Sequence, residues 1–157
     1  MKQIIFLLSL IILSFNILSC DPQGYASLSN VTFSMEPKKD SYSVGEEAKI
    51  VVSFIPNLSF YDKYTFSISL EEYNEYKNIS LFENTKKLIF LESPDDNPIT
   101  FQYEEKDLEN DQMVTRTFSI KALATGEFAC SLSSHGHDRG YQSETVSDAR
   151  ISFLVEN

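Results

Sequence analysis

The chain has 157 residues, with 13 lysines and arginines against 23 aspartates and glutamates, which gives a formal net charge of −10 at pH 7. This length suits one domain with a real hydrophobic core. Nucleic acids and anionic lipids are bound through basic surfaces, and the chain has no cluster of lysine or arginine. The charge therefore argues against both as partners and indicates a well-solvated surface.

An apolar segment opens the chain. The positive residue Lys2 precedes Ile4–Leu18, which contains only three polar residues. A membrane-spanning helix needs about 20 predominantly apolar residues, whereas this run has fifteen. Its charge, length and position predict a cleaved signal peptide over residues 1–19.

The end of this run, Ile17-Leu18-Ser19-Cys20, resembles the lipobox of bacterial lipoproteins, with an aliphatic residue three before the cysteine and a small residue directly before it. The resemblance implies that cleavage occurs in front of Cys20 and that lipid is attached to this cysteine. Two or more acyl chains hold a protein stably on a membrane, because each buried methylene contributes about 0.8 kcal/mol. The resemblance thus implies a membrane partner and a location in the bacterial cell envelope, exposed outside the cytoplasm.

Residues 20–29 are expected to form a lipidated tether. They are rich in turn-forming residues, and the nine residues after Cys20 reach at most roughly 30 Å, so the folded domain would lie close to the bilayer. The alternative is an ordinary signal peptide that is cleaved later, after Ala26.

Apolar and polar residues alternate along most of the remaining chain, with the period of β-strands that bury one face. The expected strands are residues 30–36, 48–54, 63–71, 79–82, 87–91, 98–103, 113–121, 127–133 and 149–155. Short strands separated by Asn, Asp, Gly and Pro predict an all-β sandwich or barrel with antiparallel pairing.

Two stretches resemble parts of immunoglobulin-like domains. Asp40–Phe54 has the Tyr-x-x-Gly-Glu opening of the second strand, and Ala124–Cys130 resembles the corner that enters the sixth strand. The resemblance implies one immunoglobulin-like antiparallel β-sandwich of about eight strands, over residues 30–157. The chain departs from antibody domains, because Phe128 has no hydroxyl for a tyrosine corner, residues 48–54 hold no second cysteine, and tryptophan is absent. Such an analogy implies an architecture but no function.

Cys130 is expected to be buried. If Cys20 carries lipid, Cys130 has no cysteine with which to form a disulfide. It alternates with Phe128 and Leu132 on one face of a predicted strand. A small hydrophobic role is favoured over a redox or catalytic one, because no neighbouring positive residue lowers the thiol pKa.

The segment Ser134–Ser143 is expected to be a loop between the last two strands, and it contains both histidines of the chain. Arginine and tyrosine often carry binding energy at interfaces, so we expect this loop to meet a partner. The candidate partner-binding residues are His135, His137, Asp138, Arg139 and Tyr141. The alternative is a connection that only closes a hairpin.

Two segments contain residues of the types that bind metal ions. Imidazole and carboxylate suit zinc or copper, but ligands in the His135–Asp138 loop would be mobile, and a structural site normally has four. In Glu104–Asp111, three carboxylates alternate as in a calcium loop, yet Gln112 and Phe118 stand where an EF-hand has glycine and glutamate. This excludes an EF-hand and leaves a looser calcium site as the alternative to a solvated charge run.

The motifs do not indicate catalysis. The sequence has no Gly-x-Ser-x-Gly elbow and no phosphate-binding loop. We therefore expect a non-enzymatic, lipid-anchored module of the cell envelope, without a cofactor, that binds a protein or glycan partner or supports a membrane assembly. The alternative is an envelope metal-handling protein or enzyme that uses the His135–Asp138 loop.

Overall fold

The computed structural model describes residues 30–76, 79–138 and 144–157. Its elements are β1 (Val31–Glu36), β2 (Ser41–Ser43), β3 (Glu47–Phe54), β4 (Tyr61–Tyr76), β5 (Ile79–Asn84), β6 (Leu88–Phe90), β7 (Ile99–Glu104), the 3-10 turn η1 (Glu105–Asp107), β8 (Val114–Ala122), β9 (Gly126–Asp138) and β10 (Glu144–Glu156). In this part of the chain, no helix combines the length and the hydropathy that a bilayer crossing requires.

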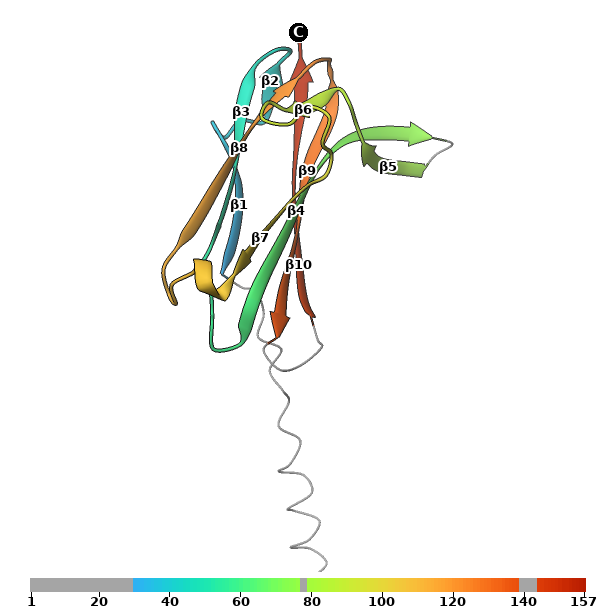
Figure 1. Cartoon of the computed structure of the whole chain (residues 1–157). Helices are drawn as coiled ribbons and strands as arrows, with labels where there is room; N and C mark the ends of the chain where they lie inside the picture. The colour runs from blue at the N-terminus through green and yellow to red at the C-terminus, as the bar shows by residue number, and fades with distance from the viewer. Residues whose placement is uncertain (1–29, 77–78, 139–143) are drawn as a thin grey trace, which may run out of the picture.

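The strands form two sheets that face each other (Figure 1). One sheet has the order β1-β3-β8-β6, and the other has the order β2-β10-β9-β4-β5, with β7 also paired to β4. The first matches the A-B-E-D sheet of immunoglobulin domains, and β10-β9-β4 matches their G-F-C sheet. The predicted fold class, an all-β immunoglobulin-like sandwich, is confirmed.

The strands differ from the expected ones in two respects. Strand β2 was not predicted, because it is too short to show a period, and it pairs parallel to the end of β10. Strands β4, β9 and β10 are also longer than expected. Strand β9 lies between β4 and β10, so backbone pairing on both sides extends it through polar residues and glycine that show no strong hydrophobic alternation.

The Tyr-x-x-Gly-Glu stretch forms the turn from β2 to β3. Gly45 has a φ of 83°, in the left-handed region that glycine adopts without steric cost. The Glu46 carboxylate accepts a hydrogen bond from the Ser43 backbone N–H at 3.0 Å and pairs with Lys39. The hydrogen bond from Lys39, followed by that from Ser43, lowers the pKa of Glu46.

Aromatic side chains fill much of the space between the sheets. Phe66 lies 4.8 Å from Phe54 and 5.2 Å from Phe101, measured between ring centroids. Ring contacts of this kind add about 0.5–1.5 kcal/mol beyond the area they bury. Cys130 is fully buried beside this core, so its predicted burial is confirmed.

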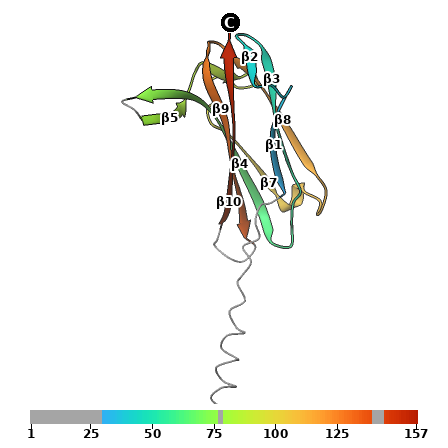
Figure 2. The ribbon, with the colours of Figure 1, turned by 180° about the vertical axis from the view of Figure 1, so that it is seen from behind.

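The two ends of the sandwich carry different connections. Val31 pairs with Phe54, which pairs with Val114, so the start of β1 and the connection after β3 share one end. Asp138, the last residue of β9, pairs with Tyr61, the first of β4. The C-terminus lies at the opposite end (Figures 1 and 2). We call the end at which β1 and β4 begin the entry end, and the end with the C-terminus the far end.

Strand β4 has two different neighbours along its edge. Residues 63–68 pair with β7, and residues 71–76 pair with β5. The β4–β5 hairpin projects sideways from the far half of the sandwich in both views (Figures 1 and 2). We call this hairpin the arm.

Candidate binding face

Four serines form a square on the outward face of β4 and β9. Strand alternation buries Phe66 and Ile68 of β4 and Leu132 of β9, which leaves the serines between and beside them on the outward side. The four residues are Ser67, Ser69, Ser131 and Ser133, paired across the strands as Ser67 with Ser133 and Ser69 with Ser131. We call them the serine face.

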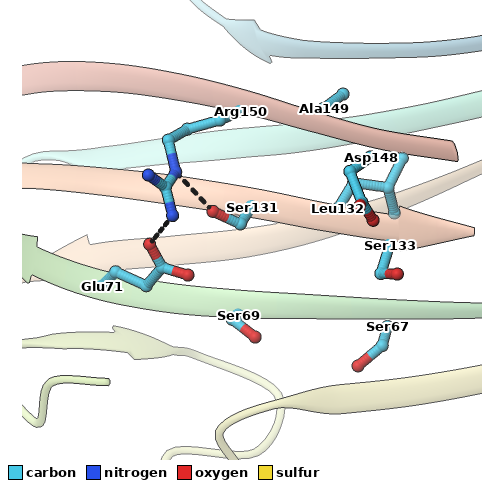
Figure 3. Close-up of a pocket in the computed structure, with 9 residues that line it drawn as sticks. All are labelled: Ser67, Ser69, Glu71, Ser131, Leu132, Ser133, Asp148, Ala149 and Arg150. Atoms are coloured by element: carbon cyan, nitrogen blue, oxygen red, sulfur yellow. Dashed lines mark hydrogen bonds and ion pairs between the residues drawn. The ribbon is translucent and has the colours of Figure 1, made fainter. Parts of the chain in front are cut away.

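Charged side chains border the serine face (Figure 3). Arg150 of β10 donates one hydrogen bond from Nε to Ser131 Oγ at 2.9 Å and another from Nη2 to Glu71 Oε2 at 2.7 Å. Asp148, also on β10, pairs in register with Ser133. The side chain of Glu71 is only 12% exposed and that of Arg150 is 49% exposed. The guanidinium is therefore held by its partners yet remains open to solvent.

The serine face and its charged border line a shallow hollow of about 440 Å³. Serine side chains are short, whereas Glu71 and Arg150 beside them are long, and Figure 3 shows these groups around the depression. Hydroxyls both donate and accept hydrogen bonds. The hollow therefore offers hydrogen-bonding groups together with one cation and two carboxylates.

The two histidines lie on β9 and not in a loop. The structure contradicts the expected loop over its first part, because Ser134 to Asp138 belong to the strand. His135 pairs with Thr65 of β4, and His137 pairs with Lys63. Backbone pairing on both edges of β9 is the physical reason, and it makes the positions of the histidines rigid rather than mobile.

Both imidazoles face outward, in line with the serine face. Nε2 of His135 lies 3.3 Å from Ser133 Oγ, and Nε2 of His137 lies 3.3 Å from Thr65 Oγ1. Both side chains are half-buried. The predicted histidines thus extend the polar surface of the serine face toward the entry end.

Of the other predicted site residues, the structure describes only Asp138. Asp138 ends β9 at the entry end. Arg139 and Tyr141 lie outside the described residues, as do Cys20 and the rest of residues 1–29, for which a signal peptide and a tether are predicted. The roles predicted for Arg139, Tyr141 and Cys20 stay predictions.

The metal alternatives gain no support from the geometry. Across residues 30–76, 79–138 and 144–157, no three His, Cys, Asp or Glu side chains converge in a way that could hold a metal ion. In the acidic stretch, Glu104 pairs with Lys106 at 2.6 Å, and the hydrogen bond from Lys106 lowers the pKa of Glu104. The three alternating carboxylates, on Asp107, Glu109 and Asp111, are exposed to solvent.

Sequence reasoning missed the serine face. The signal was present in Ser67-Ile-Ser69 and Ser131-Leu-Ser133, where serines alternate with buried aliphatic residues. Each stretch alone indicates only a strand with a polar outer side. The square appears when β4 and β9 are neighbours in this register, and the sequence does not specify that pairing.

No family model matches the chain, and the search of curated proteins finds no match. Some solved structures are similar to the chain at low identity. The CsuC–CsuE chaperone–tip adhesion subunit complex of Acinetobacter baumannii has a TM-score of 0.47 at 8% identity, and the match covers 79% of this chain and 56% of that one. The collagen-binding domain of a Staphylococcus aureus adhesin has a TM-score of 0.45 at 10% identity, covering 82% and 96%.

A cohesin module from a Clostridium perfringens family 33 glycoside hydrolase gives a TM-score of 0.42 at 13% identity, covering 81% of this chain and 97% of that one. This chain spans about half the length of the Bacillus subtilis sporulation control protein Spo0M, which it matches at 12% identity with a TM-score of 0.41. Similarities at this level assign neither a function nor a partner to this chain.

Proposed function

We propose that the chain is a non-enzymatic, lipid-anchored module of the bacterial cell envelope that binds a protein partner through the serine face. The observation that carries this proposal is the hollow where four paired serines meet Arg150, Glu71 and Asp148 on an open sheet. On this surface, short hydroxyl side chains lie at the centre and charged side chains lie at the border.

The chemistry of the surface favours a protein over a glycan. The outward side chains of residues 63–71, 129–137 and 148–152 include no phenyl, phenol or indole ring on which a sugar could stack. They offer hydroxyls, imidazoles, carboxylates and a guanidinium, which match the polar groups of a protein surface. Short side chains at the centre also let the backbone of a partner approach closely. Glycan binding is a competing outcome of the experiment below.

The proposed anchor is compatible with this surface. The chain enters the domain at the start of β1, and β4 and β9 extend, antiparallel to each other, between the entry end and the far end. A lipid on Cys20 would thus place the entry end nearest the bilayer. The serine face would then be oriented sideways, open to a neighbouring protein of the envelope.

Site-specific photo-crosslinking in intact cells tests the proposal. The full chain would carry p-benzoylphenylalanine at Ser67 or Ser133, and matched control chains would carry it at Ser53 or Thr115. The control residues are likewise paired across two strands, on the outward side of the opposite sheet. We expect a discrete protein adduct from the serine face and none from the control positions.

Three results would contradict the proposal. Equal adducts from both sheets would mean that the face has no special role, and a complete lack of adducts from Ser67 and Ser133 would remove the protein partner. Binding of isolated envelope glycans that is lost in a Ser67→Tyr/Ser133→Tyr variant would replace the protein partner with a glycan.

A further inference from the structure

A second hollow, of about 350 Å³, lies at the base of the arm, between the loops on either side of β6. Strand β8 begins at the entry end with Val114 and therefore ends at the far end with Ala122. Leu123, on the rim of the hollow, comes directly after Ala122, so the hollow is at the far end. We call it the far-end pocket. Its volume is at the small end of the range of ligand pockets, roughly 300–1,000 Å³, so it suits a single side chain better than a large ligand.

The floor of the far-end pocket is apolar. Leu70 and Leu88 line it and are 0% and 2% exposed, and Leu123 on the rim is 51% exposed. An exposed leucine beside buried ones extends the apolar surface out to the mouth. Because Leu70 and Leu88 have almost no accessible surface, an aliphatic chain that enters the pocket would cover the exposed Leu123 and Pro94 and the half-buried Ile89.

The walls of the pocket are fixed by hydrogen bonds. The Asn97 side chain accepts from the Leu70 N–H at 2.9 Å, and it donates to the carbonyls of Leu70 at 2.7 Å and Thr85 at 3.2 Å. The turn beside it is closed by a bond from the Asp96 N–H to the Ser93 carbonyl at 3.1 Å. The pocket is thus held open before any partner arrives, which reduces the ordering cost of binding.

Two carboxylates stand at the mouth. Asp95 and Asp96 line the pocket and are exposed, and neither forms an ion pair with another side chain in the described residues. Lys86 also lines the pocket. Its single positive charge is smaller than the two negative charges of Asp95 and Asp96, so the mouth has a net negative charge. The chain as a whole is also strongly acidic, which favours the approach of a basic partner.

We propose that the far-end pocket receives an arginine or lysine side chain from a basic segment of a protein partner. Such side chains place an aliphatic stem on apolar surface while the charged head stays at the water boundary. This pocket offers accessible apolar surface on Leu123, Ile89 and Pro94 and two carboxylates at its mouth. The proposal is independent of the serine face, since the two hollows share no lining residue. Two contact sites on one module would let it hold one partner at two points.

The test uses the full-length chain, labelled with 15N and held in zwitterionic detergent. It is titrated with the peptide acetyl-Gly-Arg-Gly-amide, and separately with the same peptide carrying citrulline, which is similar in shape but uncharged. We expect saturable shifts of the backbone amides at Leu88, Asp95, Asp96 and Leu123 with the arginine peptide, and binding at least about fivefold weaker with the citrulline peptide.

Variants separate the pocket from general charge attraction. Asp95→Asn/Asp96→Asn should remove the preference for arginine, whereas Asp107→Asn/Glu109→Gln should retain it. The control changes the net charge by the same amount at exposed positions on and just after η1. Equal binding of the two peptides, shifts confined to residues 104–111, or equal effects of the two double variants would each overturn the proposal.

Discussion

Asn97 takes the place of a neighbouring strand beside Leu70: its side-chain amide accepts from the Leu70 N–H at 2.9 Å and donates to the Leu70 carbonyl at 2.7 Å. Strand β7 pairs with β4 up to Ile68, and β5 pairs with it from Glu71 onward. The amide therefore completes the ladder in the gap between two strands. This contact also sets the base from which the arm projects.

Replacing Asn97 with alanine should destabilise the protein by about 1–3 kcal/mol, because it leaves the N–H of the fully buried Leu70 without an acceptor. Urea denaturation followed by circular dichroism measures the change. The matched control is Asn110→Ala, which removes the 3.0 Å acceptor of the Leu58 N–H in an exposed turn. Water can replace that bond, so a cost for Asn110→Ala equal to that for Asn97→Ala would contradict this account.

The thiol of Cys130 should be inert in the folded protein. Burial, with a smaller effect from the charge of Glu71, raises its pKa far above the ordinary value, and the thiolate is the form that reacts. In a Cys20→Ala background, thiol reagents should modify Cys130 slowly in buffer and rapidly in urea. Rapid labelling of the native protein would contradict the burial of this strand.

Substitutions of Cys130 test the packing around it. Cys130→Ser should cost about 1–3 kcal/mol, because a hydroxyl would enter an apolar site, and Cys130→Ala should cost less. Thermal or urea denaturation of the two variants gives the comparison. A serine variant as stable as the alanine variant would mean that the hydroxyl finds a partner there.

Glu92 should contribute stability that depends on pH. Its carboxylate accepts the Ser119 N–H at 2.9 and 3.2 Å, just beyond the end of β6. Partial burial acts to raise the pKa of Glu92, but the hydrogen bonds from Ser119 and from the backbone of Glu92 itself together outweigh it, and the pKa is lowered. A lowered folded-state pKa means that this stability is fully present above the ordinary value of about 4.5 and is lost as the pH falls through the folded-state pKa.

The comparison is wild type against Glu92→Gln, with Glu127→Gln as a control at an exposed position of β9. The free energy of unfolding from urea titrations should favour wild type over Glu92→Gln at pH 7, and the gap should close by about pH 3. A gap that persists unchanged at low pH would show that the charge of Glu92 has no part in it.

The fold could be predicted because its strands bury one face each. The alternation of Tyr64, Phe66, Ile68 and Leu70 is enough to identify β4, and its inward side is the core that the structure shows. The end of β9 could not be predicted in this way. Ser134 and Gly136 face inward there and are buried, so the residues that usually indicate a loop occupy core positions of a central strand.

The candidate site depends on which strands pair and in which register, and not on the local alternation of apolar and polar residues. His135 is a candidate from the sequence because it stands in a segment with a second histidine, an arginine and a tyrosine, but its setting beside Ser133 and Thr65 follows from the register of β9 with β4. The contact between Arg150 and Glu71 joins residues 79 positions apart. Local sequence does not indicate such partners, and hence the serine face emerged only from the structure.

The lipid anchor is a separate prediction about Cys20. The wild-type protein should partition into the detergent phase and incorporate labelled palmitate in cells, because two or more acyl chains are needed for stable attachment. The Cys20→Ala variant should show neither lipidation nor cleavage at this position. Equal labelling of both proteins would contradict the lipobox interpretation and leave later cleavage after Ala26 as the alternative.

Arg150 should matter for binding more than for stability. Its ion pair with Glu71 is half-exposed on the arginine side, and such pairs contribute about 1 kcal/mol or less. Arg150→Ala should therefore change the free energy of unfolding by no more than about 1 kcal/mol. It should weaken binding to the partner identified by crosslinking by about 2 kcal/mol, the size of an interface hot spot.

Two further variants make this prediction specific. Arg150→Lys keeps the charge but cannot bond Ser131 and Glu71 with the same planar fork, so its binding should lie between those of wild type and Arg150→Ala. Lys49→Ala removes an exposed cation from β3, on the opposite sheet, and should leave binding unchanged. If Lys49→Ala weakened binding as much as Arg150→Ala, net charge rather than the serine face would govern the interaction, because both variants remove one positive charge and only Arg150 borders the hollow.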